Sequence, residues 1–184
     1  IPDTAKVVLY FGRVVERKGL GYLLRAFEVV SEHNRDNNVW LMICGEGPYL
    51  DTAKQYVKRN KLSQVVFAGK IQPIHRKIFY TRASVFALPS YPRKGSVEIW
   101  GLTVNEALET GTPVVATDAV GAAFDLLDGN NGVMISHSSV EELANAIEKY
   151  SNKSRYEQHC KEVAKKYSVK NMAAAFEKCI NNNR

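Results

Sequence analysis

The chain has 184 residues, 45% of them hydrophobic, which is enough to build one sizeable core but not two. We therefore expect one domain over residues 1–184. Three cysteines at wide spacings argue against a disulfide framework and against a zinc site, and they indicate a reducing compartment. No apolar run approaches the roughly 18 residues that a membrane-spanning helix needs.

Short β-rich runs alternate with longer amphipathic stretches along the whole chain. In the first half we expect strands at 6–11, 39–44, 65–68 and 84–88, separated by helices at 20–32, 50–60 and 74–82. The second half continues with a helix and a strand in turn at 102–110, 113–117, 122–126, 132–135 and 140–150, and ends with helices at about 155–167 and 170–181. Ser139 and Glu142 form a capping-box pattern. This alternation predicts an α/β fold, a Rossmann-like parallel sheet with helices on both faces.

Two glutamates eight positions apart, Glu98 and Glu106, flank the start of the predicted helix 102–110. The backbone N–H groups of Trp100, Gly101 and Leu102 would point out of this start, where the helix dipole favours a phosphate. Each carboxylate can accept from two adjacent sugar hydroxyls. Two isolated glutamates more often face water, but this segment combines them with a dense set of turn signals. A sugar nucleotide carries all of the groups that such a site would bind.

The segment EIWGLTVNEALETGTPVVATD resembles the E-x7-E signature of the glycosyl transferases group 1, a large family of retaining enzymes with the two-domain GT-B architecture. Four earlier blocks, FGRVVERKG, ICGEGP, VVFAGKI and ASVFALPS, follow in the family's order and at about its spacing. The resemblance implies the C-terminal, donor-binding half of such an enzyme, without the N-terminal acceptor half. Because Ile1 opens the chain directly before a strand, we expect a piece of a longer protein.

The resemblance also implies roles for individual residues. Arg13 and Lys18 match the basic pair that neutralises the departing diphosphate. From the residues alone, two ordinary solvent-exposed cations in a loop would explain the pattern equally well. Glu98 matches the glutamate that contacts the transferred sugar, and Glu106 the one that binds the ribose hydroxyls. The other expected donor-binding residues lie in the turns after the strands, at Gly12, Gly69, Lys70, Ile71, Trp100, Gly101, Leu102 and Thr103.

The implied reaction transfers a sugar from a nucleotide-diphosphate sugar to a glycan or lipid-linked acceptor, with retention of configuration and without a metal or other cofactor. The sequence contains no Asp-x-Asp triplet and no closely spaced His or Cys set. Two alternatives stay open: a sugar-nucleotide epimerase or a phosphorylase on the same two-domain plan, and a non-catalytic nucleotide-binding module. The isolated domain is expected to turn over little or nothing. The donor base is left open, because main-chain groups would hold it.

Two features depart from the family pattern. The loop Tyr91–Val97 is longer than usual and includes Arg93 and Lys94, so we expect it to reshape the sugar pocket. In addition, Gly121 stands alone where a glycine pair is common. The four histidines are scattered, and His75 is expected at the surface rather than in catalysis.

The positive charge is concentrated at the C-terminal end. Residues 149–184 hold nine Lys and Arg against three acids, whereas residues 1–148 hold sixteen of each. One hypothesis is that this face approaches an anionic membrane from the cytoplasmic side. The alternative is a solvated helix face, on which Tyr156, Cys160, Val163 and Tyr167 pack inward. Nucleic acid is not expected, since aromatic residues are not interleaved with these charges.

Overall fold

The computed structural model describes residues 1–34 and 38–182, and a six-stranded parallel sheet lies at its centre. The strand order is β3-β2-β1-β4-β5-β6. The strands are β1 (Lys6–Phe11), β2 (Val39–Cys44), β3 (Val65–Gly69), β4 (Val85–Leu88), β5 (Val114–Thr117) and β6 (Gly132–Ile135). The chain runs outward from β1 to β3 and then crosses back to β4. This reversal is a topological switch point, where ligands of open α/β sheets bind.

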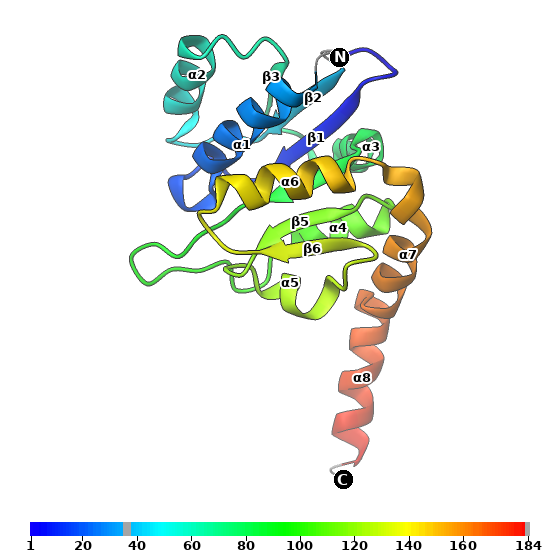
Figure 1. Cartoon of the computed structure of the whole chain (residues 1–184). Helices are drawn as coiled ribbons and strands as arrows, with labels where there is room; N and C mark the ends of the chain where they lie inside the picture. The colour runs from blue at the N-terminus through cyan, green and yellow to red at the C-terminus, as the bar shows by residue number, and fades with distance from the viewer. Residues whose placement is uncertain (35–37, 183–184) are drawn as a thin grey trace.

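Helices cover both faces of the sheet, as the sequence predicts (Figure 1). On one face α1 packs against α6 and α2, and on the other α4 packs against α3 and α7. The helices are α1 (Leu20–His33), α2 (Leu50–Arg59), α3 (Arg76–Arg82), α4 (Leu102–Glu109), α5 (Gly121–Leu126), α6 (Val140–Tyr150), α7 (Lys153–Lys166) and α8 (Val169–Asn182). Two short 3-10 turns, η1 (Glu16–Lys18) and η2 (Pro73–His75), lie in loops. The predicted fold class is confirmed.

The core follows from strands that are apolar on both sides. Every residue of β4 and β5 is buried, as are five of the six residues of β1. Such near-continuous burial is what a parallel sheet covered on both faces requires. Tyr80 joins this core from α3, stacking on Phe11 with ring centroids 5.2 Å apart and meeting Phe86 edge-on at 5.6 Å. The core therefore reaches the carboxyl end of β1.

The differences from the predicted boundaries are local. Helix α3 begins two residues later than expected, because Pro73 opens a separate 3-10 turn before it. The Ser139 side chain caps α6 by accepting from the Glu142 N–H at 3.3 Å. The reciprocal half of the capping box does not form, since Glu142 instead accepts from the N–H of Ser136 at 2.9 Å.

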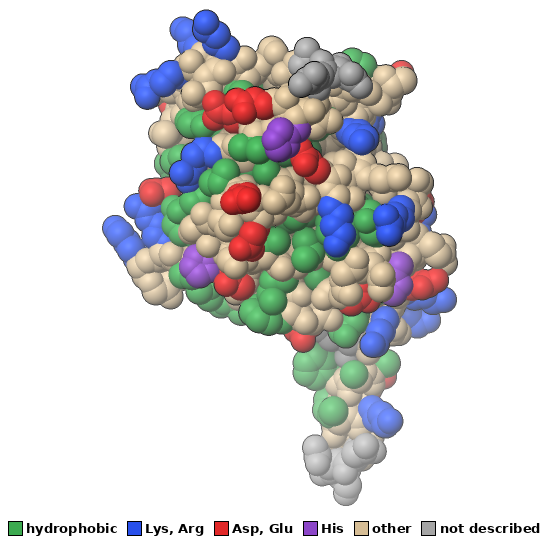
Figure 2. Space-filling model, in the orientation of Figure 1, with side chains coloured by type: hydrophobic (Ala, Val, Ile, Leu, Met, Phe, Trp, Pro, Cys, Tyr) green, Lys and Arg blue, Asp and Glu red, His purple; other side chains and the backbone are tan. Residues whose placement is uncertain are grey.

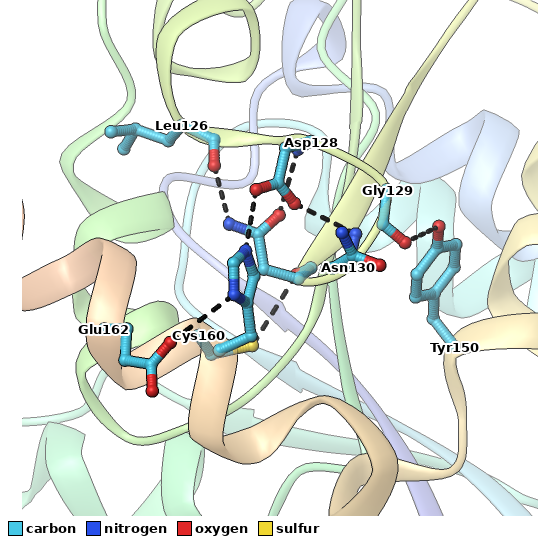
Figure 3. A network of polar contacts seen from close by, with 9 residues as sticks. Leu126, Asp128, Gly129, Asn130, Tyr150, Cys160 and Glu162 are labelled. Carbon is cyan, nitrogen blue, oxygen red and sulfur yellow. Dashed lines mark hydrogen bonds and ion pairs between the residues drawn. The ribbon is translucent and has the colours of Figure 1, made fainter.

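A polar network attaches α6 and α7 to the turn between α5 and β6 (Figure 3). His159 lies 2.7 Å from the carboxylate of Asp128, and the Tyr150 hydroxyl donates to the carbonyl of Gly129 at 2.9 Å. Asn131 is fully buried and donates to the carbonyl of Leu126 at 2.6 Å. These bonds fix the edge of the sheet at β6.

Of the four residues expected to pack inward at the C-terminal end, three do so at least in part. Tyr156 and Cys160 are buried on α7, and Val163 is partly buried. Tyr167 is 40% exposed, so its predicted inward packing is wrong; it caps the end of α7, where the chain turns into α8. Helix α8 extends away from the body, with Phe176 exposed (Figure 1). Within the described ranges, no helix has the length and apolar character needed to cross a membrane.

Candidate functional site

The candidate site lies at the carboxyl ends of β1, β2 and β4. The loops after β1 and β2 are joined by backbone bonds, from Gly12 N–H to the Cys44 carbonyl at 3.0 Å and from Val14 N–H to the Glu46 carbonyl at 2.9 Å. A Cβ at Gly45 would lie 1.8 Å from the Gly12 carbonyl oxygen, so only glycine permits this approach. The two loops therefore form one surface at the switch point.

The turn η1 brings two cations from the β1 loop toward β4. Gly19 follows this turn with a φ of 73°, and a Cβ there would lie 1.7 Å from the Pro89 carbonyl oxygen. The tight contact holds Arg17 and Lys18 beside the segment that follows β4. Sequence reasoning proposed Lys18 for this site but overlooked Arg17, its neighbour in the same Glu-Arg-Lys run.

Glu98 forms ion pairs with both of these cations. One carboxylate oxygen, Oε2, lies 2.6 Å from Lys18 Nζ and 3.0 Å from Arg17 Nη1. The Lys18 and Glu98 side chains are only 12% and 15% exposed, so water screens their attraction weakly. Burial raises the pKa of Glu98, but the hydrogen bonds and charges of Lys18 and then Arg17 outweigh it and hold that pKa below its ordinary value. Glu98 is therefore an anion at neutral pH.

The backbone around Glu98 is fixed by the loop between β5 and α5. Its N–H donates to the Ala119 carbonyl at 3.1 Å, and its carbonyl accepts from the Gly121 N–H at 3.0 Å. A Cβ on Gly121 would lie 1.9 Å from the Ile99 carbonyl oxygen. The single glycine at this position thus permits the close packing that positions Glu98.

Helix α4 begins four residues after Glu98, and three backbone N–H groups around its start lack an acceptor among the described residues. Gly101 caps the helix in the left-handed region, with a φ of 95°. Within the part of the chain that the structure describes, the N–H groups of Trp100, Gly101 and Leu102 donate to no protein group. The Trp100 indole donates to Asn105 Oδ1 at 2.9 Å, which holds the ring against the helix. This geometry suits a phosphate.

Glu106 is held by two residues that sequence reasoning missed. Its Oε1 accepts from Arg76 Nη1 at 3.0 Å, and its Oε2 accepts from the Tyr80 hydroxyl at 2.7 Å. Burial, and then the hydrogen bond to Glu106, raises the pKa of Tyr80, which keeps the phenol protonated as a donor. The Glu106 side chain is still 33% exposed, and a carboxylate has about four acceptor positions. It can therefore accept further hydroxyl groups.

Three adjoining cavities line this edge of the sheet. A cavity of about 290 Å³ contains Arg13 and Lys18, and a second of about 340 Å³ contains Gly12, Arg13 and Arg76. A third, of about 450 Å³, contains Arg76 and Glu106. Arg13 is shared by the first two cavities and Arg76 by the last two, so the three cavities form one row that includes Arg13, Lys18 and Glu106. Glu98 joins this row through its ion pair with Lys18.

Two of the remaining predicted positions also line this row. Lys70 and Ile71 line the second cavity, and the Gly69 carbonyl accepts from the Gly45 N–H at 2.7 Å. The Thr103 hydroxyl is buried and has no partner among the described residues. The same part of the chain contains no group of three or more His, Cys, Asp or Glu side chains that could hold a metal ion. His75 is exposed, as expected.

Comparison with known proteins gives a consistent family. Residues 1–167 match the family model of "Glycosyl transferases group 1". The chain is 31% identical over 153 residues to a D-inositol 3-phosphate glycosyltransferase of Corynebacterium aurimucosum, covering 80% of this chain and 35% of that protein. It is 32% identical over 144 residues to a GDP-mannose-dependent phosphatidylinositol monomannoside mannosyltransferase of Mycolicibacterium smegmatis, covering 77% and 37%. The chain thus spans little more than a third of either relative.

Two solved structures share the fold. Sucrose-phosphate synthase from Thermosynechococcus elongatus superposes with a TM-score of 0.83 at 24% identity, over 99% of this chain and 46% of that one. Anabaena HepE in complex with UDP superposes with a TM-score of 0.81 at 21% identity, over 97% and 49%. Both matches cover nearly all of this chain and about half of the other.

Proposed function

The chain belongs to the glycosyl transferases group 1 family, and from this premise we propose that it is the donor-binding half of a retaining glycosyltransferase. The observation that carries the proposal is the row formed by Arg13, Lys18, Glu98 and Glu106 around the start of α4. In this proposal Glu98 accepts from the sugar hydroxyls, the cations and the free N–H groups bind the diphosphate, and Glu106 accepts from the ribose hydroxyls.

In the proposed complex the diphosphate lies between the start of α4 and the cations of the β1 loop. Arg13 has no ion-pair partner in residues 1–34 and 38–182, so its guanidinium is available to a phosphate. Lys18 is already held within reach by Glu98 at 2.6 Å. Such preorganised cations stabilise the charge that grows on a departing diphosphate.

The proposed reaction proceeds on one face of the sugar. The bond between the anomeric carbon and the diphosphate oxygen breaks, and the acceptor oxygen bonds to the same carbon from the same side. The proton of the acceptor hydroxyl passes to the departing diphosphate. Glu98 orients the sugar by accepting from its hydroxyls, while Lys18 stabilises the leaving group. This scheme uses no metal ion and no cofactor.

The acceptor is proposed to belong to glycan or glycolipid synthesis. The two bacterial relatives act on an inositol phosphate and on a phosphatidylinositol mannoside by their names, which supports an acceptor of this kind. The C-terminal helices are proposed to meet an anionic membrane, since they carry the excess of Lys and Arg, and Phe176 on α8 is exposed. Sedimentation with neutral and with anionic vesicles tests this contact. Equal binding to both kinds of vesicle would contradict the proposed membrane contact.

The donor site is tested by titrating UDP, GDP and ADP against the isotope-labelled chain by NMR. We expect one of the three to bind weakly, with shifts at Gly12, Gly101 and Leu102. Arg13→Ala should weaken binding by at least about tenfold, because one charge-assisted bond contributes about 1.5–3 kcal/mol. Its fold should be unaffected, since the side chain is exposed. Unchanged affinity in Arg13→Ala would contradict the diphosphate role.

The ribose role of Glu106 has its own variant. Glu106→Gln keeps an oxygen that can accept from Tyr80 but removes the charge that pairs with Arg76. We expect weaker binding of a ribonucleotide and little change for the 2′-deoxy nucleotide, which lacks one of the two hydroxyls. An equal loss for both nucleotides would assign Glu106 to fold maintenance alone.

A separate test distinguishes a transferase from an epimerase. With the full-length enzyme, consumption of donor without an acceptor would favour an epimerase.

A further inference from the structure

The loop between β4 and α4 carries a small hairpin that the donor site does not need. Arg93 and Ser96 exchange backbone hydrogen bonds at 3.0 and 2.9 Å, and the two residues between them, Lys94 and Gly95, have φ values of 49° and 73°. Positive φ at both positions is the geometry of a two-residue type I′ turn. The hairpin therefore has a defined shape, and it projects from the sheet in Figure 1.

Three contacts clamp this hairpin to η1. The Tyr91 N–H donates to the Arg17 carbonyl at 2.9 Å, and the Tyr91 hydroxyl lies 3.5 Å from a carboxylate oxygen of Glu16. Arg93 forms an ion pair with the same carboxylate. Tyr91 also packs edge-on against Tyr22, with ring centroids 5.2 Å apart. The hairpin and the β1 loop thus line one cavity together.

This cavity of about 290 Å³ is strongly positive. Its lining includes the basic residues Arg13, Arg17, Lys18, Arg93 and Lys94. Glu16, the one acid of its lining, pairs with Arg93, and Glu98 pairs with Arg17 and Lys18. Two carboxylates therefore offset two of five positive charges. Figure 2 shows basic side chains gathered where the loop projects.

The two cations without an ion-pair partner come from different loops. In the described ranges neither Arg13 nor Lys94 has an ion-pair partner, and Lys94 is exposed. Arg13 also lines the neighbouring cavity, and with Lys18 it is proposed to bind the donor diphosphate, whereas Arg93 and Lys94 line only the hairpin cavity. One diphosphate can use Arg13 and Lys18, and this leaves Lys94 without an anion beside Arg93, whose one ion-pair partner among the described residues is Glu16.

We propose that Arg93 and Lys94 form a second anion subsite, which binds a phosphate group on the acceptor. The inference rests on the proposed function, because it is Glu98 beside this cavity that is expected to hold the transferred sugar. A phosphate bound here would place an acceptor hydroxyl next to that sugar. The excess charge would also be offset only when donor and acceptor are both bound, which favours acceptors that carry phosphate over neutral ones.

The experiment titrates glycerol 3-phosphate against the labelled 184-residue chain by NMR, with and without a saturating nucleoside diphosphate. We expect shifts at Lys94 and Gly95, and an affinity that the nucleotide leaves within about twofold. Lys94→Asn should weaken this affinity about three- to tenfold, since one charge-assisted contact is lost at an exposed position. Asparagine tolerates the left-handed backbone of the turn. Arg93→Gln is the second variant and should act in the same direction.

Lys61→Asn is the matched control. Lys61 is exposed, and its φ of 53° repeats the backbone conformation of Lys94 in the loop between α2 and β3, before the amino end of β3. Glycerol 3-phosphate affinity should not change in this variant. If saturating nucleotide abolishes binding, the cavity holds only the donor diphosphate and the inference is wrong. Equal losses for the Lys61 and Lys94 variants would also overturn it. Failure of nucleotide binding itself would instead count against the donor site.

Discussion

Replacing Glu98 with Gln tests the ion pairs at the centre of the site. The substitution keeps the shape of the side chain and one acceptor oxygen, but it removes the charge that holds Lys18 at 2.6 Å and Arg17 at 3.0 Å. A bond from Lys18, which is 12% exposed, contributes about 1.5 kcal/mol, and the partly exposed pair with Arg17 contributes about 0.5 kcal/mol. Glutamine retains part of this as a neutral hydrogen bond.

We therefore expect Glu98→Gln to lower the free energy of unfolding by about 1–2 kcal/mol at pH 7. At about 2–4 °C per kcal/mol for a chain of this size, the melting temperature should fall by about 2–8 °C. The loss depends on pH in a defined direction. Folding lowers the pKa of Glu98, so its ion pairs stabilise the folded chain fully above the ordinary value of 4.5, and this stability is lost as pH falls through the lower folded pKa.

The assay is urea unfolding of wild type and variant at several pH values from 7 down to about 3.5, the range in which Glu98 begins to titrate. The difference between them should be constant down to about pH 5 and shrink below it, because protonated glutamate and glutamine then resemble each other. Glu177→Gln is the control, as Glu177 is exposed on α8 and has no ion pair among the described residues. A difference that persists unchanged at pH 3.5 would refute the electrostatic explanation.

Two further predictions concern packing and cysteine reactivity. Gly121→Ala should destabilise the chain by about 2–3 kcal/mol in urea unfolding, because the new Cβ would lie 1.9 Å from a backbone carbonyl oxygen. Gly21→Ala is the control and should be nearly neutral, because its Cβ would meet only a movable tyrosine hydroxyl. Similar effects at the two sites would refute the steric argument. Burial raises the pKa of the Cys44 and Cys160 thiols to about 12. Iodoacetamide at pH 8 should therefore label only the exposed Cys179 in the folded chain but all three cysteines in urea, as counted by intact mass. Labelling of either buried thiol in the folded chain would contradict this protection.

The sheet and most helix boundaries could be predicted because they depend on local patterns. The strand Val39–Cys44, for example, is a continuous apolar run bounded by turn-forming residues. Helix α6 follows Ser139, whose own side chain caps it. The start of α3 was predicted less well, because proline is equally compatible with an α-helical first turn and with the 3-10 turn found there. Local rules cannot decide between these two.

The partners of the two glutamates could not be predicted in the same way. Tyr80 and Arg76 reach Glu106 across 26 and 30 residues of sequence, and their contact depends on how α3 packs against α4. The spacing of Arg76 and Tyr80, one helical turn apart, predicts a shared face but not what that face meets. Arg17 was overlooked for a simpler reason, since three charged residues in succession do not reveal which of them turns inward.

The spacing of Glu98 and Glu106 has a structural cause beyond the signature that it matches. Glu98 is attached through its backbone to the loop before α5, whereas Glu106 is attached through its side chain to α3. Helix α4 begins four residues after Glu98 and carries Glu106 in its second turn. One residue more between them would rotate Glu106 by about 100° around the helix axis and carry it away from Tyr80. The eight-residue interval therefore keeps two independently anchored carboxylates aligned on either side of the free N–H groups at the start of α4.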